Sequence, residues 1–116
     1  MSSADQAQCA EQELTKAEAD LNEAFADALQ QYSQTGSKTN DALPKSEARE
    51  QGQYEARMRN ALIASQEIWL RYRTAACKCV AEMYDGGTIT ASAVPACQAA
   101  LSRERAKFLR DYFSEK

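Results

Sequence analysis

Histidine is absent from these 116 residues, and this absence narrows the possible functions first. Histidine is the usual acid–base group at neutral pH, the base of most hydrolytic triads and the commonest metal ligand in proteins. Carboxylates such as Glu104 and Asp111 remain, but no spacing in the sequence places two of them around a cleft. We therefore expect a protein that is not an enzyme and that holds no metal or cofactor.

Glycine and proline are also scarce, with four and two residues, and β-branched residues are few. Alanine, leucine and glutamate are abundant instead, and these residues favour helices. A chain of this length is sufficient for one domain with a modest core. The composition predicts a single all-α domain that covers residues 1–116.

Long hydrophobic runs are missing, so we expect no integral membrane segment. The opening Met-Ser-Ser-Ala-Asp-Gln lacks the basic and apolar regions of a signal peptide, so an exported protein would be the mature part of its precursor. The basic residues are dispersed, which argues against a nucleic-acid partner. Acidic residues, by contrast, gather in residues 1–34, which contain seven acidic residues and only one lysine. This region would attract cationic partners.

Hydrophobic periodicity predicts three amphipathic helices. The first runs over 5–33, the second from 44–46 to about Tyr84 with a bend at Gly52, and the third begins near Pro95. A loop rich in polar residues and glycine is expected over Thr35–Pro44, and a short connection over 88–94. Long helices with short connections pack as an antiparallel three-helix bundle. The apolar stripe of the second helix is predicted to contain Tyr54, Met58, Ala61, Ser65, Ile68, Tyr72, Ala75 and Cys79, and that of the third Val94, Cys97, Leu101, Arg105, Phe108 and Tyr112.

Four cysteines stand at Cys9, Cys77, Cys79 and Cys97. A bridge between Cys77 and Cys79 is excluded because residues two apart on a helix point to different faces. The remaining pairings are Cys77–Cys97 with Cys9–Cys79, or Cys9–Cys77 with Cys79–Cys97. The first is favoured, because Cys79 lies on the predicted stripe and an antiparallel bundle brings Cys9 towards it. Two bridges in an oxidising compartment are the leading interpretation, and reduced core cysteines of a cytosolic protein are the alternative.

Motifs spread along the chain resemble the lysozyme inhibitor LprI-like family of small secreted or periplasmic bacterial proteins. The family pattern is close to A-Q-x-x-W-x-x-Y/F-R-D-x-x-C, then a G-G-S turn, then C-x-x-x-L-T-x-x-R-x-x-x-L. This chain departs from it at Thr74, Thr88 and Ser102, and it adds Cys79. Besides Cys77 and Cys97, the matching residues include Gln66, Trp69, Tyr72, Arg73, Gly86, Gly87, Leu101 and Arg105.

The resemblance implies a helical bundle, a location in the bacterial envelope and a protein partner, with lysozyme as the namesake candidate. We interpret Trp69 as a side chain packed between helices, and Arg73 and Arg105 as partly buried arginines with structural partners. Gly86 and Gly87 are expected to provide positive φ at a helix end. Our best candidates for contacts with a cationic enzyme are Glu11, Glu18 and Glu23, predicted on the outer face of the first helix.

Two functions follow from these observations. The first is a periplasmic or secreted binding protein that inhibits lysozyme-type muramidases through a protein–protein surface. The alternative is a structural or adaptor protein of the envelope that does not inhibit. The sequence indicates no particular oligomeric state.

Overall fold

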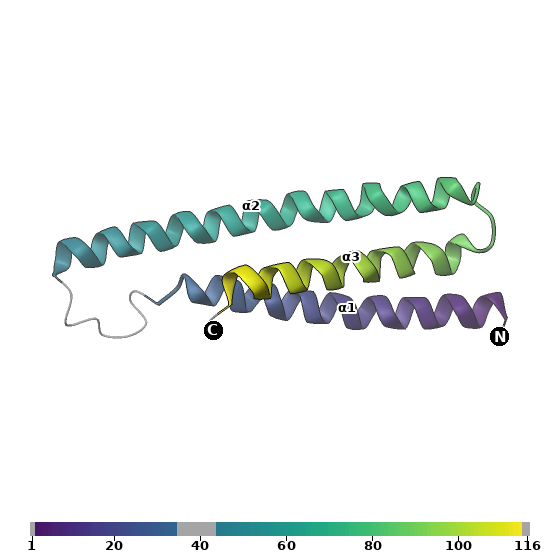
Figure 1. Ribbon diagram of the computed structural model, residues 1–116, viewed down its shortest axis with the longest axis horizontal. Helices are drawn as coiled ribbons and strands as arrows, with labels where there is room; N and C mark the ends of the chain where they lie inside the picture. The colour runs from purple at the N-terminus through teal and green to yellow at the C-terminus, as the bar shows by residue number, and fades with distance from the viewer. Residues whose placement is uncertain (1, 35–43, 115–116) are drawn as a thin grey trace.

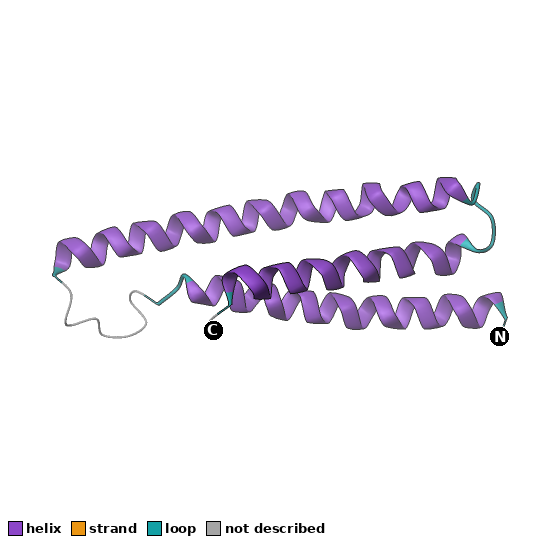
Figure 2. Cartoon of the chain, viewed as in Figure 1, coloured by secondary structure: helices purple, strands orange, loops and turns teal. Residues whose placement is uncertain are grey.

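The computed structural model describes residues 2–34 and 44–114, and these residues form three α-helices and no strand (Figure 1, Figure 2). Helix α1 spans Ser3–Gln31, α2 spans Lys45–Met83 and α3 spans Thr90–Phe113. Consecutive helices run in opposite directions, so the predicted all-α antiparallel bundle with long helices is confirmed. The loop predicted over 35–44 lies outside the described residues except for Pro44.

The bundle is a rod with extents of 64 × 23 × 17 Å. Its radius of gyration is 19.1 Å, whereas a compact domain of this length would have about 13 Å. The 39 residues of α2 set this length, since a helix rises about 1.5 Å per residue. A bend at Gly52 is not needed, because α2 runs through this residue as one helix.

The helix ends follow local sequence signals. Ser2 and Asp5 form a capping box in which each side chain accepts a hydrogen bond from the other residue's backbone N–H. At the same end of the rod α2 stops where Asp85 and Gly86 adopt positive φ angles of 52° and 68° (Figure 1). Gly87 does not share this conformation, but a Cβ there would lie 3.1 Å from the Tyr84 carbonyl oxygen. The prediction of positive φ therefore holds for Gly86 and is wrong for Gly87, where close approach of the backbone is the constraint.

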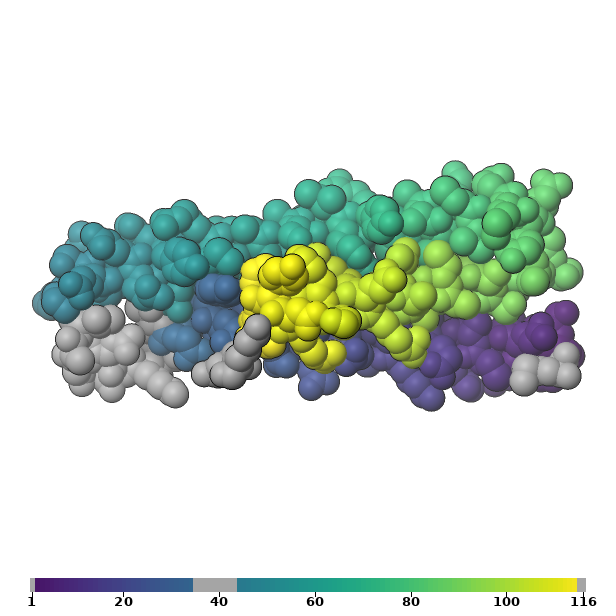
Figure 3. All heavy atoms as spheres, viewed as in Figure 1, coloured from purple at the N-terminus to yellow at the C-terminus, as the bar shows by residue number. Residues whose placement is uncertain are grey.

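Helices α1 and α3 form the most closely packed pair, and in Figure 3 α3 lies between α2 and α1. Small side chains line this contact and let the two backbones approach closely. Leu109 is fully buried within it, and Leu62 of α2 joins the same core. The buried residues of the α1–α3 contact are Ala17, Leu21, Ala24, Ala28, Ala99, Ser102, Ala106 and Leu109. Helix α1 thus buries a face of small and apolar residues.

The predicted apolar stripe of α2 is wrong by one position. Tyr54, Ile68 and Tyr72, which belong to that stripe, are exposed. The face that turns inward carries polar residues: buried Glu55 accepts a hydrogen bond from the Gln34 N–H, just beyond the end of α1, and buried Gln66 accepts one from Arg105 of α3. Residues of the inward face are Glu55, Leu62, Gln66, Trp69, Arg73 and Cys77.

The predicted stripe of α3 is likewise only partly buried. Phe108 and Tyr112 are exposed, while Ala99, Ser102 and Ala106 fill the contact with α1. Small residues contribute little to a hydrophobic periodicity pattern. Here, however, they form the closest helix contact of the fold, between α1 and α3.

A disulfide joins Cys77 to Cys97, with their Cα atoms 5.7 Å apart, and ties the end of α2 to the start of α3. The predicted second bridge is wrong, since Cys9 and Cys79 are exposed free cysteines. The shifted face of α2 explains this result: Cys77 turns inward and Cys79 outward. Helices α1 and α2 also make few direct contacts, because α3 packs against both.

Helix α3 begins at Thr90, five residues before the predicted start at Pro95. The turn before it is held by hydrogen bonds from the Thr90 and Ala91 N–H groups to the carbonyls of Gly87 and Thr88. The Thr90 hydroxyl also donates to the Gly87 carbonyl at 2.7 Å. These contacts establish a first helical turn, so the predicted connection over 88–94 is largely helical.

Candidate functional site

The motif residues of α2 and α3 meet where these helices pack, in the middle of the rod. Arg105 of α3 reaches across to α2, where its Nε donates to Gln66 Oε1 at 2.9 Å and its Nη2 to Ser65 Oγ at 2.7 Å. Gln66 is buried, and the two helices are therefore joined by a polar contact within the packed region. Both acceptors are neutral, so they do not neutralise the guanidinium charge of Arg105.

Trp69, the single tryptophan, lies partly buried against the core cluster and close to two arginines. The guanidinium carbon of Arg73 is 5.6 Å from the ring centroid, and that of Arg105 is 6.0 Å away. Cation–π contacts of this kind stabilise by about 0.5–2 kcal/mol each, with larger values when the cation is desolvated. Trp69 thus links the two arginines, one on its own helix and one on α3.

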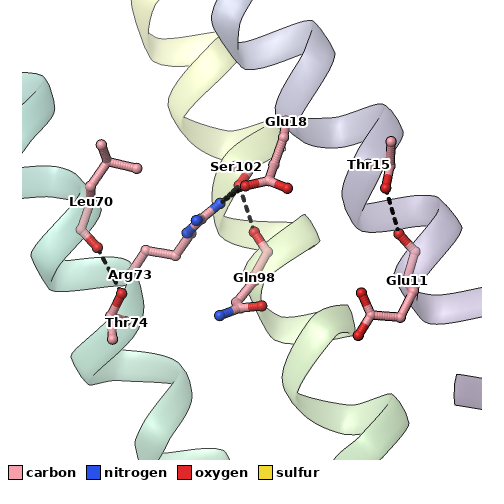
Figure 4. A network of polar contacts seen from close by, with 8 residues as sticks. All are labelled: Glu11, Thr15, Glu18, Leu70, Arg73, Thr74, Gln98 and Ser102. Atoms are coloured by element: carbon pink, nitrogen blue, oxygen red, sulfur yellow. Dashed lines mark hydrogen bonds and ion pairs between the residues drawn. The ribbon is translucent and has the colours of Figure 1, made fainter.

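Arg73 joins all three helices. Its Nη1 donates to Glu18 Oε2 of α1 and to Ser102 Oγ of α3, each at 3.1 Å (Figure 4). The Ser102 hydroxyl in turn donates to the Gln98 carbonyl at 2.7 Å. The Arg73 side chain is only 13% exposed, and its Nε is buried with no hydrogen-bond partner among the described residues. This arginine has structural partners, as the sequence suggested, and one of them is the Glu18 carboxylate.

Two open hollows lie along the seam between α2 and α3 and share Phe108. The first measures about 220 Å³ and is bordered by both aromatic and charged side chains. The second measures about 210 Å³ and is almost entirely apolar. Their lining residues are Trp69, Tyr72, Leu101, Glu104, Arg105 and Phe108 for the first, and Met58, Ala61, Leu62, Ser65, Phe108 and Phe113 for the second. We call the two hollows together the α2/α3 groove.

The acidic candidates on α1 do not form one surface. Glu11 and Glu18 are seven residues apart and share a face, but Glu23 lies about 140° further around the helix. Glu18 also binds Arg73 and therefore faces α2 rather than away from the bundle. The expectation of a shared outer face is wrong, and only Glu11 and Glu23 are exposed.

Arginines of α3 neutralise part of the remaining acidic charge. Asp20 accepts hydrogen bonds from Arg110 at 2.8 and 3.1 Å, and these bonds hold the pKa of the Asp20 carboxyl below its ordinary value. Arg103 likewise donates to Glu13 at 2.7 Å and lowers the pKa of that carboxyl. Much of the acidity in residues 1–34 therefore serves to bind α3 to α1.

Three features of this region were not found by sequence reasoning. The role of Ser102 could have been suspected, because a hydroxyl on the face of α3 that carries Ala99 and Ala106 must be buried with a partner. The bond between Gln66 and Arg105 needed the register of α2, which periodicity placed one residue away. The exposure of Phe108 had no sequence signal at all.

Other chemistry finds no support in the part of the chain that the structure describes. No group of three or more histidine, cysteine, aspartate or glutamate residues there could hold a metal ion. None of the described helices is both long and apolar enough to cross a membrane.

The fold and the site define a small, disulfide-bridged helical protein with a groove between two helices. The family model described as "Lysozyme inhibitor LprI" matches residues 1–109. The chain therefore belongs to this family of lysozyme inhibitors, as its motifs suggested. No curated protein and no solved structure matches the chain.

Proposed function

We propose that this protein is a periplasmic or secreted binding protein of the bacterial envelope that inhibits a lysozyme-type muramidase. The observation that carries the proposal is the family match over residues 1–109. The Cys77–Cys97 bridge supports export, because disulfides persist in oxidising compartments. Inhibition would come from occupation of the enzyme by a folded partner, without chemistry on the part of this chain.

The exposed carboxylates of α1 are the groups best suited to a cationic enzyme. Glu23 and Asp27 are neighbours one helical turn apart, and Glu11 stands nearer the start of the helix. None of the three is in a close ion pair within the described residues and all three are exposed, although Glu23 and Asp27 also interact electrostatically with Arg110 of α3. A complex held by such charges forms quickly and weakens as salt screens them.

The first test is hydrolysis of bacterial cell walls by a basic lysozyme, titrated with this protein at low salt. We expect inhibition that saturates near one equivalent and that weakens at higher ionic strength. Absence of inhibition by the folded, bridged protein would overturn the proposed function.

Matched variants then locate the contact. We expect the pair E23Q/D27N to weaken inhibition about 2- to 30-fold, since each exposed charge pair contributes roughly 0.2–1 kcal/mol. The single variant E11Q tests the other side of α1. The pair E50Q/E82Q removes the same net charge from exposed positions of α2 and serves as the control. An equal loss in the control would show that net charge matters and the α1 surface does not.

The alternative is an envelope adaptor that does not inhibit, and the α2/α3 groove favours it by offering a binding surface away from α1. Recovery of one defined partner from periplasmic extract, with no effect on muramidase activity, would support this function instead.

A further inference from the structure

Aromatic side chains in and beside the α2/α3 groove remain exposed to solvent in the folded protein. Tyr72 is 57% exposed and Phe108 41% exposed, although both line the groove. Tyr112 is 71% exposed and lies next to Phe108, with 4.8 Å between ring centroids. Aromatic side chains gathered at a hollow are typical of interaction sites, because a partner that covers them removes apolar surface from water.

Arg105 stands at the centre of this aromatic surface with an unneutralised charge. Of the arginines that bond to another helix through side chains, Arg73, Arg103 and Arg110 each contact a carboxylate. Arg105 donates hydrogen bonds only to the oxygens of Ser65 and Gln66 among the described residues, and its Nη1 makes no hydrogen bond there. Burial also lowers the pKa of its guanidinium, because it removes water from the charged group.

Ring contacts compensate this charge in part. The Arg105 guanidinium carbon is 5.4 Å from the Phe108 ring centroid and 6.0 Å from that of Trp69. A carboxylate would compensate it more fully, because charge-assisted hydrogen bonds to arginine are about twice as strong as neutral ones. The guanidinium is thus oriented by α2 and Trp69, and part of it remains available to a ligand.

We propose that the α2/α3 groove binds an extended peptide segment of a protein partner, in which an acidic side chain bonds to Arg105. The apolar neighbours of that acidic residue would cover Phe108 and the two hollows beside it. An extended segment suits two hollows placed end to end along a helix seam. Glu104 at the groove offers an acceptor for a peptide N–H.

This binding is separate from the proposed contact of α1 with a muramidase, because it involves different helices. Trp69 provides the readout, since it is the single tryptophan and it lines the groove. The probe is the acetylated and amidated pentapeptide Ala-Leu-Glu-Leu-Ala, and its matched control carries glutamine in place of glutamate. Neither peptide absorbs in the tryptophan region, and no muramidase is present.

We expect the glutamate peptide to change Trp69 fluorescence saturably, and the glutamine peptide to bind about fivefold or more weakly. The variant R105Q should abolish this preference while the fold, followed by far-UV circular dichroism, is retained. R105K keeps the charge but not the planar fork, and it should keep only part of the preference. R103Q is the control, because it removes an arginine of α3 whose partner is Glu13. The R103Q variant should prefer the glutamate peptide as strongly as the unaltered protein does.

The proposal is overturned by equal affinity for the two peptides, or by no saturable change up to about 5 mM peptide. It is also overturned if R105Q or R105K folds and retains the full preference. Failure of muramidase inhibition has no bearing on these titrations, so the two proposals fail separately.

Discussion

Replacement of Arg73 by methionine tests whether the polar contact in Figure 4 holds the three helices together. Methionine keeps most of the side-chain volume and removes the guanidinium. The variant loses the hydrogen bonds to Glu18 and Ser102, and the cation–π contact with Trp69. Ser102 keeps its bond to the Gln98 carbonyl, so no new buried hydroxyl is left unsatisfied.

The expected magnitude follows from opposing contributions. Hydrogen bonds of a charged group contribute about 1.5–3 kcal/mol each when buried, but the Glu18 side chain is 44% exposed and its bond is screened. The Arg73 Nε is buried without a partner, and an unsatisfied donor costs about 1–3 kcal/mol, a cost that methionine removes. We therefore expect R73M to lower the free energy of unfolding by about 1–2 kcal/mol, well below the gross value of the lost bonds.

Urea unfolding followed by Trp69 fluorescence measures this change, with far-UV circular dichroism as a probe that does not depend on the local environment of Trp69. E18Q alone should cost less than about 1 kcal/mol because its side chain is half exposed. The double variant R73M/E18Q should cost less than the sum of the two single variants, since both remove the same ion pair. Strict additivity, or an R73M protein as stable as the original, would refute the structural role of this contact.

Three further perturbations test other parts of the fold. The pair C77S/C97S opens a loop with a sequence separation of 20 and should lower the free energy of unfolding by about 3 kcal/mol, measured by thermal or urea unfolding. The control pair C9S/C79S should be nearly neutral, and equal effects of the two pairs would contradict the observed bridge. A106L should cost about 1–3 kcal/mol by overpacking the α1–α3 contact, while A100L on the exposed face of α3 should not; a stable A106L protein would show that the contact is loose. The lowered pKa of Asp20 contributes stability above its ordinary value of 3.8, and this contribution is lost as pH falls through the depressed value. Urea midpoints measured between pH 5 and pH 2.5 should therefore fall less steeply for D20N than for the unaltered chain, and parallel curves would exclude an energetic role for the Arg110 pair.

The helices could be predicted because their signals are local. Helix-forming composition, the Gly86-Gly87 stop and the acidic N-terminus each act within a few residues, and the observed bounds differ from the predicted ones mainly at α3. There, hydrogen bonds to Gly87 and Thr88 start the helix before Pro95, and such turn contacts leave little trace in a sequence. The Cys77–Cys97 pairing was also predicted correctly, although the argument that favoured it placed Cys79 on the buried face of α2, which the structure contradicts.

The register of α2 could not be predicted, for a physical reason. A hydrophobic periodicity argument assigns aromatic residues to the core and charged residues to the surface, and α2 does the reverse at several positions. Tyr72 faces the groove, while Arg73, one residue later, crosses to α1 and α3. Only the partners on other helices make burial of that arginine favourable, and these partners are distant in sequence. The same error moved Cys79 inward and produced the mistaken second bridge.

The two helix contacts differ in chemistry, and this difference explains where a binding surface can form. Helices α1 and α3 meet through small and apolar residues and pack closely, so their contact leaves no room for a partner. Helix α2 is attached by a disulfide at one end and by arginine contacts in the middle. Helices α2 and α3 pack less closely than α1 and α3, and the hollows that remain beside the polar side chains between them form the α2/α3 groove. Arg105 bridges this space on its aromatic side, and it is also the arginine between helices that contacts no carboxylate. The same side chain therefore attaches α2 to α3 and is able to bind an acidic segment.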